Sequence, residues 1–281
     1  MELTDYQKKL FPYAYNILGS YDDAKDAVQD VVVRHLLSDH THIDNESNYL
    51  IKSVINQSIN IKKRGSKTIN SKIRLPEPIA TDNADSGIIS KDILSYSVLV
   101  LLDKLNPKER AVFILKEAFD YSHEEIAETL QVSIENSRKM LSRAKSKLGE
   151  MRNKKDSAPF YSTRHLEDYI TAIQTGNVKI LEQMLTHDIS VMTDGGNISI
   201  VASYLEGADK VIKLVTYVYK EYQTATTIKI SIINHQPALL FFLDSKLVNC
   251  QIFDILPESG MIRGIYSMVD PEKLKNLAKS Y

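Results

Sequence analysis

The sequence predicts a multidomain protein in which two all-α helical domains precede an α+β domain. Apolar residues recur at helical spacing through most of the first half of the chain, and short β-branched runs replace that pattern in the second half. Between the helical stretches lies Leu75-Pro76-Glu77-Pro78, where two prolines prevent a helix from continuing. The predicted segments are a helical domain at 1–70, a linker at 71–91, a second helical domain at 92–152 and the α+β domain at 160–281.

The composition limits the class of protein. With 281 residues and 43% apolar content, the chain can bury more than one core. No apolar run is long enough to span a membrane, and the N-terminal MELTDYQKKL has no apolar stretch behind its charges, so we expect a cytoplasmic protein. The single cysteine, Cys250, excludes an internal disulfide and is too little for a cysteine-based metal site, and we interpret it as a strand residue. We expect no metal and no cofactor.

Charge is distributed unevenly along the chain, although the net charge is only -1. Residues 61–76 contain six basic side chains and no acid, and residues 138–155 contain eight against Glu150 alone. Phosphate neutralisation is local, so two such patches are sufficient for DNA contact. An acidic cluster lies between Asp22 and Asp30.

The first helical domain is expected to hold three helices. Apolar spacing runs from Thr4 to Leu37 and breaks at Gly19, after which Ser20 can cap a second helix. A third helix is expected from near Ser47 to Gly65, a good C-terminal cap residue.

The strongest local signal is a helix-turn-helix. Ser122 and Glu125 form a capping box ahead of a short helix, and Ser133 caps a longer helix after a three-residue turn. The outward face of the longer helix is polar and basic, which suits the DNA major groove, although a solvated basic helix in a bundle would show the same pattern. The residues expected to face inward are Ile134, Ser137, Leu141, Ala144 and Leu148.

The remaining elements follow from the same patterns. We expect one helix over 91–105 and another from Pro107 to Phe119. In the last domain we expect two helices over Thr163–Leu185 and one over Ala208–Tyr222. The strands, in a mostly antiparallel sheet, are expected at ISVMT, ISIVAS, TTIKISII, ALLFFL, LVNCQIFDIL and IRGIYSMV.

Three stretches resemble region 4 of bacterial sigma factors. They are Leu105-Asn106-Pro107-Lys108-Glu109-Arg110, Glu124-Glu125-Ile126-Ala127 and Ser142-Arg143-Ala144-Lys145. The resemblance implies that residues 92–152 bind the minus-thirty-five promoter element. The side chains expected to contact DNA there are Ser133, Glu135, Asn136, Arg138, Lys139, Ser142 and Arg143.

The N-terminal helices look like sigma region 2, on the strength of Tyr13-Ala14-Tyr15, Gly19-Ser20 and the acidic run that ends in Arg34. In that family the segment binds the clamp of the beta-prime subunit in core RNA polymerase. Asp26, Gln29 and Asp30 share one helix face, which suits pairing with the basic coiled coil that the family recognises. These acids could instead complement the helix dipole, and for Asp22 and Asp23 we prefer that interpretation.

By the same resemblance, the third helix and the loop from Ser38 to Glu46 recognise and open the minus-ten promoter element. Amides and one aromatic beside lysines can hold unstacked bases. The residues expected to contact DNA are Tyr49, Ser53, Asn56, Asn60, Lys63, Arg64 and Lys67. Those expected to face the core are Leu50, Val54, Ile55 and Ile59. An ordinary polar helix face is the alternative.

The last domain resembles the SnoaL-like domain, of the nuclear transport factor 2 superfamily, that a subgroup of extracytoplasmic-function sigma factors carries. Leu75-Pro76-Glu77-Pro78, Asp194-Gly195-Gly196 and Val269-Asp270-Pro271-Glu272-Lys273-Leu274 carry the likeness. It implies that Leu75, Pro76, Glu77, Pro78, Asp194, Gly195 and Gly196 regulate the sigma domains, with no separate anti-sigma factor required. We expect the loop around Asp194 to pack near Leu75–Pro78, although Asp194-Gly195-Gly196 could be only a hairpin turn.

The last domain is not expected to be an enzyme. Relatives in the superfamily include cyclases, and His165, His187, Asp188 and His235 are acid–base candidates. No spacing among them forms a motif, and we expect His187-Asp188 at the end of a helix. The cone interior could accept a small apolar ligand, lined by Val191, Phe241, Phe242 and Phe253.

These features together predict a sigma factor of the extracytoplasmic-function type that directs promoter-specific transcription initiation. Its expected partners are core RNA polymerase and promoter DNA, and its own SnoaL-like domain is expected to regulate it. The alternative is a DNA-binding helix-turn-helix regulator with a ligand-binding or cyclase-like C-terminal domain. Such a regulator needs neither the face of Asp26, Gln29 and Asp30 nor a second DNA-binding helix.

Overall fold

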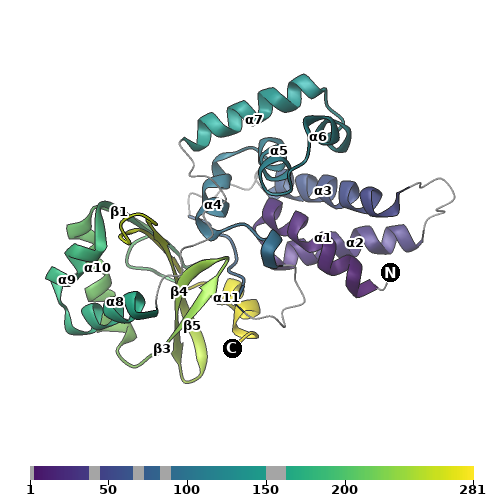
Figure 1. The fold of residues 1–281 in the computed structure, drawn as a ribbon. Coiled ribbons are helices and arrows are strands. Elements are labelled where there is room, and N and C mark those ends of the chain that lie inside the picture. Colours follow the sequence, from purple (N-terminus) through teal and green to yellow (C-terminus); the bar gives the residue numbers. More distant parts are fainter. Residues whose placement is uncertain (1–2, 38–44, 66–72, 83–89, 150–162) are drawn as a thin grey trace. The chain divides into compact units, whose positions relative to one another are not determined.

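The computed structural model describes residues 3–37, 45–65, 73–82, 90–149 and 163–281. The chain divides into two compact units (Figure 1). The first unit contains residues 1–70 and 87–155, and the second contains residues 71–86 and 156–281. The two predicted helical domains therefore form one unit, whereas residues 71–86 belong to the same unit as the C-terminal domain. The predicted domain boundaries remain predictions.

The first unit begins with three helices, as predicted: α1 (Leu3–Leu18), α2 (Tyr21–Leu36) and α3 (Glu46–Gly65). Ser20 caps α2 by accepting a hydrogen bond from the amide of Asp23, which confirms the predicted break. The predicted core face of α3 is buried, together with Ile51 and Ser58.

The predicted helix over 91–105 is wrong, because the structure divides it into three short pieces. These are η2 (Ser90–Asp92), α4 (Tyr96–Leu101) and η3 (Leu102–Lys104). The side chain of Asn16 on α1 donates to the carbonyl of Asp92 and accepts from the amide of Leu94. This tertiary contact takes two backbone groups out of a helical ladder, and local periodicity cannot reveal it.

The helix-turn-helix is confirmed. It consists of α6 (His123–Leu130) and α7 (Ile134–Leu148), which follow α5 (Pro107–Glu117), and the predicted capping box joins Ser122 to Glu125. Ser133 caps α7 through the amide of Asn136. One inward residue was predicted wrongly: Ile134, in the first turn of α7, is exposed, and Met140 is buried instead.

The second unit is an α+β domain, as predicted. Its helices are α8 (Thr163–Thr175), α9 (Val178–Met184), α10 (Ala208–Val218), continued by a π-helical turn η4 (Tyr219–Gln223), and α11 (Pro271–Ala278). Its strands are β1 (Leu185–Asp194), β2 (Tyr204–Glu206), β3 (Thr227–Ile233), β4 (Gln236–Leu243), β5 (Lys246–Ile255) and β6 (Ile262–Met268).

The six strands form one sheet in the order β2-β1-β6-β5-β4-β3. Only the β1–β6 pair is parallel, so the predicted mostly antiparallel sheet is confirmed. Helices α8 to α10 cover one face, where they share a buried apolar cluster with the strands, and α11 packs on the other face (Figure 1). Cys250 is a buried free thiol on β5, as predicted.

Two local predictions in this unit are wrong. ISIVAS is a loop, in which the Ile198 carbonyl and the Ile200 side chain lie close to Gly195, and β2 begins only at Tyr204. The amide of Ile198 donates to the Gly195 carbonyl at 2.7 Å. His187 and Asp188 lie exposed on β1 and not at the end of a helix, since the strand follows α9 without a break.

Candidate nucleic-acid interface and linker clasp

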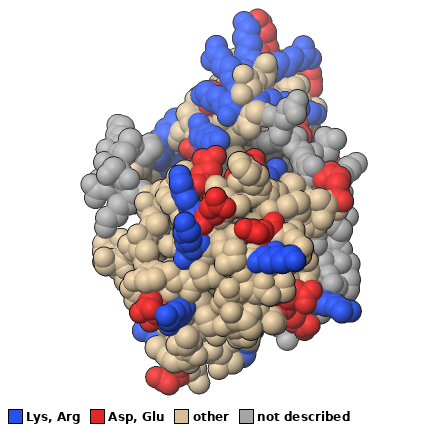
Figure 2. All heavy atoms as spheres, turned by 90° about the vertical axis from the view of Figure 1, so that its left-hand side faces the viewer, with Lys and Arg blue, Asp and Glu red and all other residues tan. Residues whose placement is uncertain are grey.

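The outward face of α7 is open to solvent. All seven predicted minus-thirty-five residues, from Ser133 to Arg143, are exposed. Arg138 and Lys139 make only exposed ion pairs, with Glu124 at 3.9 Å and with Glu135 at 2.6 Å. Such pairs exchange readily for phosphate contacts. Figure 2 shows Lys and Arg side chains gathered at the top of the view, where α7 lies.

His123, at the start of α6, supports α7 from behind. Its Nδ1 lies 2.9 Å from the Ser137 hydroxyl. Burial and the neighbouring cations Lys116 and Arg138 lower the pKa of His123.

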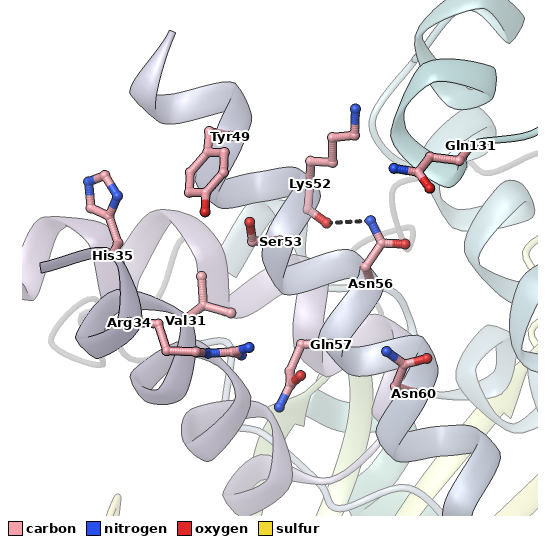
Figure 3. Close-up of a pocket in the computed structure, with 10 residues that line it drawn as sticks. All are labelled: Val31, Arg34, His35, Tyr49, Lys52, Ser53, Asn56, Gln57, Asn60 and Gln131. Atoms are coloured by element: carbon pink, nitrogen blue, oxygen red, sulfur yellow. Dashed lines mark hydrogen bonds between the residues drawn. The ribbon is translucent and has the colours of Figure 1, made fainter. Parts of the chain in front are cut away.

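A groove of about 450 Å³ runs along the predicted minus-ten face of α3 (Figure 3). Four of the seven predicted residues line it, namely Tyr49, Ser53, Asn56 and Asn60. Side chains that the sequence reasoning missed complete the lining: Val31, Arg34, His35, Lys52, Gln57 and Gln131. Gln57 could have been found, because it follows Ser53 by one helical turn. Arg34 comes from α2 and Gln131 follows the end of α6, and only the tertiary structure brings them here.

The remaining minus-ten residues lie at and beyond the end of α3. Lys63 and Arg64 are exposed in its last turn, whereas Lys67 and most of the predicted base-capture loop lie outside the described residues. At the start of α3, the Nε2 of His35 lies 2.7 Å from the Glu46 carboxylate. Hydrogen bonds from His35 and Tyr6 lower the pKa of Glu46. This pair joins the end of α2 to the start of α3.

Asp26, Gln29 and Asp30 lie exposed on one face of α2, where helical spacing predicted them. Gln57 in the groove donates to the Asp30 carboxylate at 3.4 Å, and the Arg34 guanidinium donates to the Asp30 carbonyl at 3.1 Å. The acidic face and the α3 groove therefore adjoin each other at Asp30.

In the second unit, Asp194 clasps the linker. Its carboxylate is 4% exposed and accepts three hydrogen bonds, from the amides of Leu75 at 2.8 Å and Gly196 at 2.9 Å and from the Lys273 ammonium at 2.7 Å. Lys273, on α11, also donates to the Leu75 carbonyl at 2.6 Å. Leu75 is thus held through both of its backbone polar groups. The expected proximity of the Asp194 loop to Leu75 is observed, and Lys273 is a residue of this clasp that the predicted site did not include.

The two glycines of the clasp have different roles. Gly196 has φ +56°, and an added Cβ there would collide with the Asp270 carboxylate, which caps α11. Gly195 leaves room for Ile198 and Ile200. The sequence Asp194-Gly195-Gly196 therefore does more than form a hairpin turn, because it packs against both the linker and the start of α11.

A second anchor holds the other end of the linker at β3. The amide and carbonyl of Ile79 bond to the side chain and amide of Asn234, each at 2.9 Å. The amide of Thr81 donates to the Ile232 carbonyl at 3.0 Å, and Asp82 accepts from the Ser231 hydroxyl at 3.0 Å. Residues 79–82 thus extend the sheet edge.

The two anchors show how the linker crosses the sheet. Between β1 and β3 lie four strand spacings, roughly 19 Å. The six residue-to-residue steps from Leu75 to Thr81 span about 20 Å when the backbone is extended. Pro76 and Pro78, both buried, favour that extended backbone. The segment therefore crosses the sheet on the face of α11, with Glu77 half-buried between the prolines.

The histidines of this domain do not form a common site. His165 lies in the first turn of α8, and His235, with φ +62°, forms the β3–β4 turn with Asn234. Within the described residues no group of three or more potential metal ligands occurs, and none of the described helices could cross a membrane. Val191, Phe241 and Phe253 belong to the buried apolar cluster, whereas Phe242 lies outside it under Lys229.

Comparison with known proteins finds one matching family model and similar sigma factors. Residues 96–148 match the family model for sigma-70 region 4. The chain is 26% identical over 278 residues to the probable ECF RNA polymerase sigma factor SigI of Mycobacterium tuberculosis, covering 95% of this chain and 92% of that protein. It is 23% identical over 234 residues to the ECF RNA polymerase sigma factor SigJ of the same organism, covering 79% and 74%. The crystal structure of M. tuberculosis SigJ shares the fold, with a TM-score of 0.75 at 20% identity over 97% of this chain and 96% of that one.

Proposed function

We propose that this chain, by sequence and fold an RNA polymerase sigma factor of the extracytoplasmic-function type with a SnoaL-like C-terminal domain, binds core RNA polymerase through α2 and promoter DNA through α3 and α7. The observation that carries this proposal is the capped helix-turn-helix, whose basic outer face is open within the region 4 match. The relatives are sigma factors, which indicates a regulatory rather than an enzymatic role.

Core binding is assigned to Asp26, Gln29 and Asp30, which we propose contact the clamp of the beta-prime subunit. All three are exposed, so their replacement by Ala leaves the helix packed. Mixing the full chain with purified core RNA polymerase and measuring the complex by fluorescence anisotropy tests the assignment. The triple Ala variant is expected to lose at least ten-fold in affinity, since charged contacts at an interface are each worth about 1 kcal/mol or more. The matched control replaces two exposed acids of α8, Glu167 and Asp168, by Ala. Equal binding by the triple variant and the control would refute the assignment.

DNA contact by α7 is assigned to Ser133, Glu135, Asn136, Arg138, Lys139, Ser142 and Arg143, and by α3 to Tyr49, Ser53, Asn56, Asn60, Lys63, Arg64 and Lys67. Arg and Asn on α7 suit base edges, and the lysines suit phosphates. Gel-shift measurement of the sigma–core complex on fragments of promoter-containing DNA tests both faces. Replacing Arg143 by Ala is expected to reduce affinity and relax sequence preference, whereas Lys63→Ala is expected to weaken binding uniformly.

We further propose that the C-terminal domain regulates the sigma regions through the linker, in place of a separate anti-sigma factor. The linker joins the last described residue of α3 to η2, and residues 75–82 are bound at both ends by the second unit. A bound linker limits the length of free chain between regions 2 and 4, and hence how far they can separate.

Limited trypsin digestion tests whether the clasp holds the linker. Arg74 is exposed and directly precedes Leu75, so cleavage after Arg74 requires the Leu75 amide to leave Asp194. Lys273→Met, which keeps the unbranched apolar stem and removes the ammonium group, is expected to accelerate that cleavage. Lys275→Met on the same helix, where the ammonium faces the exposed Glu272, is the control. Equal cleavage rates in the two variants would contradict the role of the clasp.

A further inference from the structure

The α3 groove is not open along its whole length, because the end of α6 lies against it. The Asn56 amide donates to the Thr129 carbonyl at 3.1 Å, and Lys52 lies 3.6 Å from the Glu128 carboxylate. Gln131, directly after α6, forms part of the wall (Figure 3). Thr129 belongs to region 4, whereas Asn56 belongs to the proposed minus-ten face and Lys52 lines the same groove. One sigma region therefore occupies the nucleic-acid face of the other.

The contact uses the groups that DNA would need. An Asn side chain has two amide hydrogens, and those of Asn56 are directed to the carbonyls of Lys52, at 2.9 Å, and Thr129. Neither hydrogen is available to a base while the contact lasts. Lys52 faces a carboxylate where a phosphate would otherwise lie.

Helix polarity gives the end of α6 the right charge for this role. The last carbonyls of a helix have no intrahelical partner and carry partial negative charge. At this end the Glu128 carboxylate is an anion and the neighbouring Thr129 carbonyl is a neutral hydrogen-bond acceptor. A nucleotide offers the same two groups, with its phosphate as the anion and its base edge as the acceptor. We propose that the C-terminal end of α6, with Gln131, is an internal DNA mimic that occupies the α3 groove until promoter DNA displaces it.

A separate set of contacts, centred on the buried Arg110, holds α6 in position. The fully buried Arg110 of α5 donates to the Asn16 carbonyl at 3.0 Å and to Asp103 at 2.5 Å. Lys62, near the end of α3, reaches the same Asp103 carboxylate at 3.0 Å. Tyr13 of α1 stacks on Phe119 with ring centroids 3.9 Å apart. These contacts dock α5 on the first three helices, so α6 meets α3 in a defined register.

The inference rests on the proposed function, and binding of a labelled single-stranded DNA of mixed sequence to the full chain tests it. Glu128→Gln removes the anion from the groove at a side chain that is 81% exposed, without adding positive charge. Its matched control is Glu124→Gln, which makes the same change on the same helix at a carboxylate that faces Arg138 instead of α3. Gln131→Gly opens the wall and suits the left-handed backbone at this position, where φ is +52°.

Glu128→Gln and Gln131→Gly are each expected to bind the DNA roughly two- to five-fold more tightly than the Glu124→Gln control at low salt, with a smaller gain at high salt. The mimic is overturned if neither variant binds the DNA more tightly than the control. It is also overturned if none of the proteins binds the DNA measurably. Core RNA polymerase binding is measured on the same proteins. Intact core binding without the DNA gain rejects only the mimic, whereas loss of core binding in all of them, wild type included, rejects the proposed function.

Discussion

Two acid–lysine contacts illustrate how burial changes the role of an ion pair. In the linker clasp, Asp194 and Lys273 are 4% and 21% exposed, and the carboxylate accepts two further hydrogen bonds from backbone amides. In the α3 groove, Glu128 and Lys52 are 81% and 34% exposed. Removing one partner of a buried pair leaves an uncompensated charge, whereas an exposed partner returns to water at little cost. The clasp is therefore suited to fixing the linker, and the groove contact to exchanging with a competitor.

The largest effect is expected from breaking the clasp. Asp194→Ala removes the acceptor of the Leu75 and Gly196 amides and leaves Lys273 without its carboxylate. We expect the free energy of unfolding of the C-terminal domain to fall by about 3 kcal/mol. Calorimetry on the full chain measures this change. Asp188→Ala, an exposed acid on the same strand, is expected to change it by less than about 0.5 kcal/mol. Equal effects in the two variants would mean that the clasp contributes nothing.

A smaller loss is expected from filling the space beside the clasp. Gly196→Ala combines a left-handed backbone with a collision against Asp270, while Gly176→Ala has a similar φ of +64° and open space around the new Cβ. The strain common to both is about 1 kcal/mol. We expect Gly196→Ala to cost at least about 1 kcal/mol more than Gly176→Ala, since the collision also disturbs the cap of α11. Thermal unfolding of both variants separates the cost of backbone strain from the cost of the collision with Asp270. Equal costs would leave no role for Asp270.

The exposed contact is expected to contribute almost nothing to folding. Glu128→Gln should change the free energy of unfolding of the first unit by less than about 0.5 kcal/mol. Urea unfolding followed by the near-ultraviolet signal of the tyrosines measures it. A loss of unfolding free energy as large as that of Asp194→Ala would show that the exposed and the buried contact contribute equally to stability, against our expectation.

The smallest expected effect is a pH dependence of stability that comes from His123, at the start of α6. The pKa of His123 is lowered in the folded protein, so the unfolded chain takes up the proton first as the pH falls. The contribution of His123 to stability is therefore full above its ordinary pKa of about 6.5 and declines as the pH falls through and below that value. His123→Gln keeps a polar partner for Ser137 and cannot titrate. We expect the wild type to lose slightly more thermal stability than this variant between pH 7.5 and pH 5.5, and an equal loss would contradict the assignment.

Much of the fold could be predicted because its signals are local. Ser20, Ser122 and Ser133 cap helices through amides three residues away, so their role is visible in any short window of sequence. The sequences of β4 and β5 predicted less detail. Both strands are buried along most of their length, so the usual alternation of buried and exposed positions is largely absent. The division of residues 91–105 into three pieces could not be predicted, because the cause, Asn16, lies in another helix.

The candidate sites divide in the same way. Tyr49, Ser53, Asn56 and Asn60 were found because one helix carries them at helical spacing, whereas Gln131 joins their groove from another part of the chain. The sequence by itself determined the helix-turn-helix, the exposed acidic and basic faces and the extended linker, since each depends on residues a few positions apart. Only the tertiary structure decided that Lys273 binds Leu75 and that Thr129 binds Asn56. Those partners lie 198 and 73 residues apart, and a contact over such a separation depends on how whole elements pack, not on any local preference.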